Sequence, residues 1–269
     1  MKRFVMACVS ALTLAACASV STEQEVAIGG DYAQQINAQL PLVNDPEVVR
    51  YIQRLGDSIA TLADDRNLQW HFYVVDAAEV NAFAVPGGYV YINRGLIERA
   101  QNLSQVAGVL GHEIGHVTER HSIQQMEKAQ QANLGIGLGC ILIPSLCQSQ
   151  AGAAAVQIGA GALFASFSRQ DELEADAVGV RNMIRAGISP EGVPQMFEIL
   201  LRERERSPAA VEAWFSTHPT EETRIAEARG IINAYDPLIL QGLTVDSPNF
   251  QSFKRRLQSL PPSPAPRRR

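Results

Sequence analysis

The 269-residue chain predicts an α+β fold that is mainly helical and carries a small antiparallel sheet. Apolar residues recur at helical spacing over most of the chain between Thr22 and Ala234, and only residues 69–75 and 81–92 change to runs typical of strands. The composition, with 46% hydrophobic and 19% charged residues, is that of an ordinary globular protein. The formal net charge of −5 argues against a nucleic-acid-binding protein, so no nucleic-acid partner is expected.

The N-terminus predicts a secretory signal peptide over residues 1–16. A basic start, Met-Lys-Arg, precedes an apolar run from Phe4 to Ala16, which is shorter than the roughly 20 residues needed to span a bilayer. The run ends in Leu-Ala-Ala-Cys, which resembles the bacterial lipobox. That resemblance implies lipidation of Cys17 and a lipidated linker over residues 17–21. Because no Asp follows the cysteine, it also implies an outer-membrane lipoprotein of the bacterial cell envelope that faces the periplasm.

Two helices are expected first. The sequence Thr22-Glu23-Gln24-Glu25 fits a capping box, and the amphipathic stretch after it continues to about Leu40, where Pro41 ends it. A second helix is expected to begin near Asp45 and Pro46, with proline in its first turn. Its apolar stripe consists of Val48, Val49, Ile52, Leu55, Ile59 and Leu62.

The strand-like part of the chain follows these helices. Residues 69–75 are β-branched and aromatic, and residues 81–92 have the pattern of a strand, a tight turn and a second strand. Pro86 and the two glycines after it fix the turn. They also favour an edge position for this hairpin, because proline cannot donate a hydrogen bond to a neighbouring strand.

One long helix is expected from Ser104 to about Gln131, and an apolar segment with almost no charge follows between Gly135 and Phe167. The sequence leaves open whether this segment is a mobile lid or membrane-contacting hairpin, or plain packed helices. Cys140 and Cys147 lie within it, and in an oxidising compartment they either form a disulfide or remain thiols. Further helices are expected from Arg169 to Ala234.

A histidine pair lies within the long helix. In His112-Glu113-Ile114-Gly115-His116 the two histidines are four residues apart, which places both imidazoles on one helical face. This spacing suits two ligands of a single tetrahedral Zn²⁺ ion. Glu113 lies about 100° farther around the helix and can reach a water at the metal without ligating the metal. The neighbouring positions are apolar, so the helix is buried and its histidines need partners.

A catalytic zinc ion needs a third protein ligand, and the acidic stretch after Ser168 offers candidates. Ser168 is expected to cap this helix together with Asp171, three residues later. Glu172 and Asp176 are one turn apart on a shared face, whereas Glu174 faces away from them. The spacing alone does not say whether Glu172 or Asp176 touches the metal.

Two further histidines are expected to lie outside the metal site. His121 is nine residues after His112 on the predicted long helix and therefore on the opposite side, in a structural or exposed position. His71, in a predicted strand, is expected to be a half-buried core residue.

The motifs together resemble the M48 zinc metalloproteases, over roughly Thr22 to Ala234. The resemblance rests on four segments: Asn81–Gly88, His112–His116, Glu172–Gly179, and Ser216–Pro219 with Arg224. It implies a zincin-type metallopeptidase domain over residues 22–253, with one Zn²⁺ per chain held by His112, His116 and Glu172. Asp176 is then expected to orient a ligand histidine, and Arg224 to support the site. Residues 254–269 are expected to form a tail rich in proline and arginine.

The implied reaction is zinc-assisted hydrolysis of peptide bonds, in which Glu113 takes a proton from water and delivers it to the leaving amine. His218 is expected to stabilise the oxyanion, or to occupy the open zinc position in a resting state. An extended substrate is expected to pair with the edge strand at Ala82, Phe83, Ala84 and Val85, because backbone pairing tolerates many sequences. Resemblance and compartment together suggest unfolded or misassembled envelope proteins as substrates, and outer-membrane assembly machinery as a partner.

Two other functions remain open. The first is that of a lipoprotein chaperone or assembly factor of the outer membrane with a regulatory or latent zinc site. The second is that of a zinc hydrolase that acts on a non-peptide substrate. Glu113 argues against the first, because a structural zinc site needs no general base. The edge strand argues against the second. The helical-repeat domain of larger periplasmic family members is not expected, because only about 35 residues follow Ala234.

Overall fold

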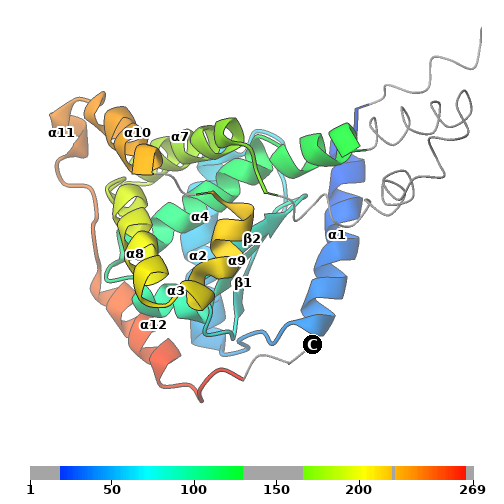
Figure 1. The fold of residues 1–269 in the computed structure, drawn as a ribbon, viewed down its shortest axis with the longest axis horizontal. Helices are drawn as coiled ribbons and strands as arrows, with labels where there is room; N and C mark the ends of the chain where they lie inside the picture. The colour runs from blue at the N-terminus through cyan, green and yellow to red at the C-terminus, as the bar shows by residue number, and fades with distance from the viewer. Residues whose placement is uncertain (1–18, 130–165, 220–221, 265–269) are drawn as a thin grey trace, which may run out of the picture.

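The computed structural model describes residues 19–129, 166–219 and 222–264 (Figure 1). The predicted signal peptide and Cys17 lie outside these residues, as does the part of the apolar segment that carries Cys140 and Cys147. Within the described residues, helices pack around a three-stranded sheet, and the prediction of a mainly helical α+β fold is confirmed. None of the helices in these ranges is long and apolar enough to cross a bilayer.

The first two helices, α1 (Thr22–Gln39) and α2 (Pro46–Ala63), begin at capped N-termini. Ser21 caps α1 in a capping box with Gln24, one residue earlier than predicted, because Ser21 and Gln24 also have the required spacing. Asp45 caps α2 and proline begins it, as predicted. Of the predicted stripe on α2, buried positions are Val48, Ile52, Leu55 and Ile59, and Val49 is exposed.

The sheet consists of β1 (His71–Val75), β2 (Ala82–Val85) and β3 (Tyr89–Asn93), in the order β1-β3-β2. β2 and β3 form the predicted antiparallel hairpin, with β2 at an edge. Its turn contains Gly87 and Gly88, whose φ angles of +82° and +98° are costly for residues with a side chain.

The prediction of a wholly antiparallel sheet is wrong at one pair, because β1 runs parallel to β3. The chain leaves β1 at one edge, crosses to the opposite edge to form β2, and turns back through the centre as β3. β3 therefore runs in the same direction as β1. The sheet is mixed, and this pairing depends on a crossover that the local sequence pattern does not reveal.

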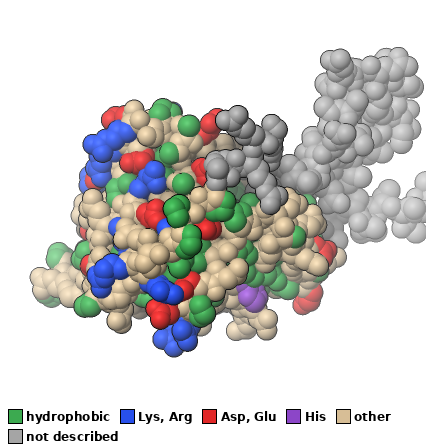
Figure 2. Space-filling view, turned by 90° about the horizontal axis from the view of Figure 1, so that it is seen from below, with side chains coloured by type: hydrophobic (Ala, Val, Ile, Leu, Met, Phe, Trp, Pro, Cys, Tyr) green, Lys and Arg blue, Asp and Glu red, His purple; other side chains and the backbone are tan. Residues whose placement is uncertain are grey.

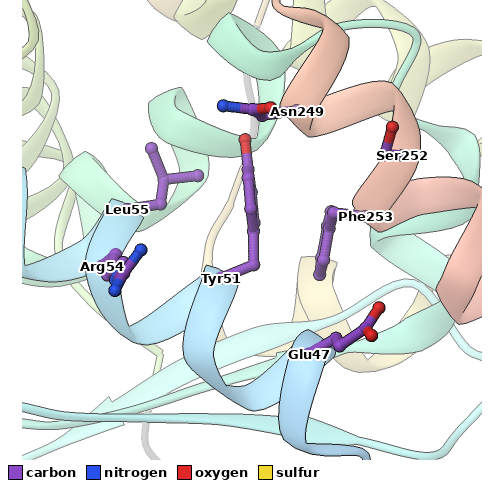
Figure 3. Close-up of a pocket in the computed structure, with 7 residues that line it drawn as sticks. All are labelled: Glu47, Tyr51, Arg54, Leu55, Asn249, Ser252 and Phe253. Carbon is purple, nitrogen blue, oxygen red and sulfur yellow. The ribbon is translucent and has the colours of Figure 1, made fainter.

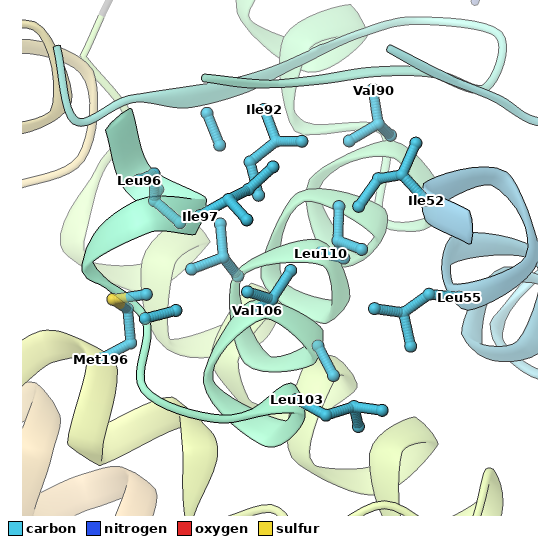
Figure 4. Packing of buried hydrophobic residues seen from close by; sticks show 14 of the residues in the cluster. Ile52, Leu55, Val90, Ile92, Leu96, Ile97, Leu103, Val106, Leu110 and Met196 are labelled. Carbon is cyan, nitrogen blue, oxygen red and sulfur yellow. The ribbon is translucent and has the colours of Figure 1, made fainter. Parts of the chain in front are cut away.

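The sheet separates two hydrophobic clusters. On one face α2, α3 (Arg94–Arg99) and α4 (Leu103–Thr118) pack in the main core, part of which is shown in Figure 4. On the other face α1 lies away from α2, α3 and α4 (Figure 1) and contributes Ile36 to a smaller cluster around Val85 and Tyr91. The hydroxyl of Tyr91 donates a hydrogen bond to Asn37 of α1. The strands are thereby held between α1 and the helical core.

The predicted long helix from Ser104 to Gln131 is interrupted. α4 ends at Thr118, Arg120 adopts a left-handed conformation with φ +60°, and a new helix occupies residues 121–129. The Arg120 guanidinium donates to Glu25, a buried residue of α1. No glycine or proline marks this break, so the helical periodicity conceals it.

The remaining described helices complete the domain. They are α7 (Arg169–Arg185), α8 (Gly192–Arg206), α9 (Pro208–Thr217), α10 (Glu222–Asn233), α11 (Pro237–Leu240) and α12 (Pro248–Gln258). α12 packs against α2 and α3, with Phe253 and Leu257 buried. The first residues of the predicted tail, up to Gln258, are therefore helical and belong to the packed domain.

Candidate metal centre

Four side chains converge inside the helical core. One ligand atom each of His112, His116, Glu172 and His218 lies within 4.8 Å of the others. The Nε2 atoms of His112 and His116 are 3.0 Å apart, and Glu172 Oε1 is 3.4 Å from His116 Nε2 and 3.1 Å from His218 Nδ1. All four residues are buried. Little histidine surface is accordingly visible in the space-filling view of Figure 2, where acidic and basic side chains are interspersed.

Glycines on α4 and α7 allow these side chains to meet. A Cβ atom at Gly115 would lie 2.7 Å from the backbone oxygen of Ala175, and one at Gly111 would lie 3.2 Å from the Cα of Gly179. The two helices therefore pack backbone against backbone. This close crossing places the histidines of α4 opposite the carboxylates of α7, because residues four apart share a helical face.

His218 comes to the cluster from the C-terminal end of α9. It follows the last helical residue, and its backbone N–H donates to the carbonyl of Trp214. The Trp214 ring stacks on the His218 ring with a centroid distance of 4.6 Å. His218 Nδ1 is 3.3 Å from His112 Nε2, and its Nε2 is 3.5 Å from Glu113 Oε1. His218 thus lies among the other candidate ligand atoms and next to Glu113.

Asp176 and Arg224 support His112 from behind. The Nδ1 atom of His112 is 2.7 Å from Asp176 Oδ1, and Arg224 donates to both oxygens of Asp176 at 2.9 and 2.8 Å. Arg224 also donates to Glu172. Burial alone would raise the pKa of Asp176, but the charge of Arg224 and the contact with His112 hold it below its ordinary value. Asp176 is therefore an acceptor that fixes the proton of His112 on Nδ1 and leaves Nε2 free to ligate.

Glu113 faces the same cluster, with its Oε1 atom 3.5 Å from His218 Nε2. Among the described residues, neither of its two carboxylate oxygens has a hydrogen-bond partner, although both are buried. Burial raises the pKa of Glu113, opposed by the nearby histidines. A buried carboxylate without a hydrogen bond is costly, and such groups are typical of sites that receive a further ligand.

The donor set fits a divalent cation. Burial lowers the pKa of His116 well below its usual range, which favours the neutral ring that a metal requires. Among the described residues, Arg224 is the one permanent cation that pairs with the carboxylates of Glu172 and Asp176, and Glu113 adds a third carboxylate to the cluster. Nitrogen donors with one carboxylate are the ligands that Zn²⁺ prefers. The residues are thus suited to a zinc ion both in charge and in chemistry.

Sequence reasoning missed the supports of His116. The Phe167 ring stacks on His116 with a centroid distance of 3.9 Å. His121 is buried and its Nδ1 is 2.9 Å from His116 Nδ1, so of its two expected positions the exposed one is wrong. The interruption after α4 turns its ring back toward His116. Glu174 faces away from Glu172, as predicted, and its exposed carboxylate lies 3.3 Å from His121 Nε2.

The predicted substrate-binding residues of β2 and His71 lie in the sheet, outside the metal cluster. Ala82 and Val85 of β2 are buried, and β2 packs against α4. His71 is half-buried and its ring stacks on Tyr89, as expected for a core residue of a strand. The candidate substrate-binding strand and the metal cluster are therefore connected through α4.

A cavity of about 550 Å³ between α2 and α12 is a different kind of site (Figure 3). It is lined by Glu47, Tyr51, Arg54, Leu55, Asn249, Ser252 and Phe253. None of these residues belongs to the metal cluster, and the lining contains no histidine or cysteine. This cavity is therefore separate from the candidate ligands at the crossing of α4 and α7.

Comparisons with known proteins agree with this geometry. The family model of peptidase family M48 matches residues 46–232. The beta-barrel assembly-enhancing protease of Escherichia coli O157:H7 is 36% identical over 230 residues, which are 83% of this chain and 47% of that protein. Metalloprotease LoiP of Escherichia coli (strain K12) is 28% identical over 224 residues, which are 80% of this chain and 83% of that protein.

The mitochondrial metalloendopeptidase OMA1 of Arabidopsis thaliana is 31% identical over 160 residues, which are 58% of this chain and 30% of that protein. The chain thus spans about half the length of the beta-barrel assembly-enhancing proteases that it matches. The matched region contains all four residues of the metal cluster together with Glu113, Asp176 and Arg224. The chain belongs to peptidase family M48.

Proposed function

We propose that the chain is a zinc-dependent endopeptidase. The observation that carries this proposal is the buried convergence of His112, His116 and Glu172 beside Glu113, whose carboxylate oxygens lack hydrogen-bond partners among the described residues. A purely structural zinc site gains nothing from an additional buried carboxylate, whereas metal-assisted hydrolysis needs a general base.

Each residue of the cluster has a definite role in this proposal. His112, His116 and Glu172 hold the ion, and Asp176 with Arg224 orients His112. When bound, zinc supplies polarisation of the scissile carbonyl and acidification of water. Glu113 accepts a proton from the attacking water and delivers it to the leaving amine. Burial of Glu113 favours its acceptance of this proton, since burial raises the pKa of its carboxyl.

Two roles for His218 predict opposite results. If His218 donates a hydrogen bond to the oxyanion, the His218→Ala substitution lowers the turnover number by about 10²–10³-fold. If His218 is a fourth ligand that caps the ion in a latent state, the same substitution raises the turnover number, because a coordination position becomes free. The position of His218 Nδ1, 3.3 Å from His112 Nε2, supports the capping role. An unchanged turnover number would remove His218 from the site.

We further propose unfolded or misassembled envelope proteins as substrates. The support is the similarity to the beta-barrel assembly-enhancing proteases, whose name refers to the assembly of beta-barrel proteins, together with the lipobox-like sequence that ends at Cys17. An extended segment of such a protein adds to the edge strand β2 at Ala82, Phe83, Ala84 and Val85. The lipid on Cys17 anchors the enzyme to the outer membrane, facing the periplasm, within reach of outer-membrane assembly machinery.

The alternative is an outer-membrane chaperone or assembly factor with a regulatory zinc site. Cleavage of unfolded casein by the wild-type chain, by Glu113→Gln and by chelator-treated protein separates the two. The proposal predicts cleavage by the wild type alone, with the Glu113→Gln rate lower by at least about 10²-fold. A Glu113→Gln protein with the wild-type rate would overturn the assigned mechanism. Cys17→Ala tests the anchor: it is expected to release the protein from the membrane fraction, and retention there would exclude lipidation as the anchor.

A further inference from the structure

His116 has an outer partner that is chemically unlike the partner of His112. Its Nδ1 atom lies 2.9 Å from Nδ1 of His121, and His121 Nε2 lies 3.3 Å from a carboxylate oxygen of Glu174. The other oxygen of Glu174 accepts a 2.7 Å hydrogen bond from Gln170. A continuous chain of hydrogen bonds thus leads from His116 to the molecular surface.

The proton positions along this chain follow from its two ends. If His116 ligates through Nε2, its proton is on Nδ1 and must be donated to Nδ1 of His121. His121 Nδ1 then acts as an acceptor, so the proton of this ring is on Nε2 and is donated to the Glu174 carboxylate. The carboxylate therefore selects, through His121, the tautomer of His116 that can bind a metal.

The contact between His116 and His121 depends on the break in the backbone after α4. On an uninterrupted helix, residues five apart such as His116 and His121 are separated by about 140° of rotation and cannot meet. The left-handed Arg120 ends the helix and returns His121 toward α4. The left-handed conformation of Arg120 costs roughly as much free energy as a lost hydrogen bond. The Arg120 guanidinium donates hydrogen bonds to the Glu25 carboxylate and to the carbonyl of Val20.

Packing holds both rings in this arrangement. Phe167 stacks on His116 with an interplanar angle of 20°, and its ring centroid is 6.2 Å from that of His121. The backbone N–H of Phe167 donates to the carbonyl of Thr217, which immediately precedes His218. His121 has 1% of its surface exposed, so water does not compete for its nitrogen atoms.

We propose that His121, backed by Glu174, is a positioning residue that fixes the tautomer and the ring orientation of the zinc ligand His116. This inference rests on the proposed zinc site. It assigns a function to a histidine outside the ligand set and explains why the chain tolerates a strained residue directly after the metal-binding helix.

The test is the zinc affinity of the full chain, measured by competition with a chromophoric chelator. His121→Phe keeps the ring volume and removes the acceptor, and it is expected to weaken zinc binding by about 10–100-fold. His121→Asn places an amide oxygen near the position of Nδ1 and is expected to recover most of this loss. The matched control is His71→Phe, a half-buried histidine of β1 whose replacement is expected to leave zinc affinity unchanged.

The outcomes separate this inference from the proposed function. A wild-type chain that binds no zinc overturns both. A wild-type chain that binds zinc, with His121→Phe equal to it or with His121→Asn as weak as His121→Phe, overturns the inference alone. Should His121→Phe lack a cooperative unfolding transition, Glu174→Ala decides, because this side chain is 45% exposed and its removal spares the core. Its zinc affinity is expected to fall, and an unchanged affinity contradicts the proposed hydrogen-bond chain.

Discussion

The two histidines of the zinc helix are supported in contrasting ways. His112 rests on a buried carboxylate, Asp176, which is itself fixed by two hydrogen bonds from Arg224. His116 rests on a second imidazole, His121, which ends on the exposed carboxylate of Glu174. The first support is a buried carboxylate with a buried guanidinium, and the second is a buried imidazole that leads to a carboxylate exposed to solvent. Removing a side chain from the support of His112 is therefore expected to destabilise the fold. Removing one from the support of His116 is expected mainly to weaken metal binding.

The largest effect is expected for Asp176→Ala. It leaves Arg224 buried with one carboxylate partner fewer, and a broken buried ion pair typically costs about 3–5 kcal/mol of the free energy of unfolding. Urea denaturation of the metal-free chain measures this loss, with Glu174→Ala as the matched exposed control. Equal and small losses for both variants would abolish the contrast between the two supports.

The same ion pair contributes to the dependence of stability on pH in acid. The pKa of Asp176 is lower in the folded chain than in the unfolded one, so its contribution is complete above the unfolded value of about 4. It is lost as the pH falls through the lower, folded value. Asp176→Ala is therefore expected to differ most from the wild type at neutral pH and to approach it in strong acid.

An intermediate effect is expected for Gly115→Ala. The added methyl group would meet the backbone oxygen of Ala175 at 2.7 Å and force α4 away from α7, with a loss of about 1–3 kcal/mol. Gly230→Ala in α10 is the control, because among the described residues outside its own helical turn no atom lies within 4 Å of its Cβ position, and alanine favours the helix. Gly115→Ala is expected to weaken zinc binding as well. A Gly115→Ala chain as stable as Gly230→Ala would contradict the close helix crossing.

The smallest effect is expected at Arg120. Arg120→Val places a β-branched residue in the left-handed region and is expected to cost about 1–2 kcal/mol, whereas Arg120→Gly relieves the strain and offsets the loss of the Glu25 contact. Zinc affinity is expected to stay closer to the wild type in Arg120→Gly than in Arg120→Val, because the turn is kept. The reverse order would show that the left-handed turn does not position His121.

The support of His112 was the more predictable of the two. The four-residue spacings of His112 with His116 and of Glu172 with Asp176 place each pair on one helical face, and the structure brings both pairs together. The assignment of Glu172 as a ligand came from family resemblance, because spacing alone treats Glu172 and Asp176 alike. Arg224 lies far along the chain and was likewise implied by resemblance alone.

The support of His116 could not be predicted from local patterns. The helical periodicity of the sequence continues through Thr118–Arg120, although the helix itself ends there. The left-handed conformation of an arginine has no sequence signature. Phe167 reaches His116 only through the tertiary fold. For the same reason the parallel pairing of β1 with β3 was missed, since it depends on a crossover between distant strands.

The most direct test of the account is the zinc content of the full chain, measured by mass spectrometry under native conditions together with casein cleavage. One zinc ion is expected in the wild type and in Glu113→Gln, with cleavage only by the wild type. Loss of both zinc and cleavage is expected in Glu172→Ala. A wild-type chain without zinc, or a Glu113→Gln chain that cleaves casein at the wild-type rate, would contradict it.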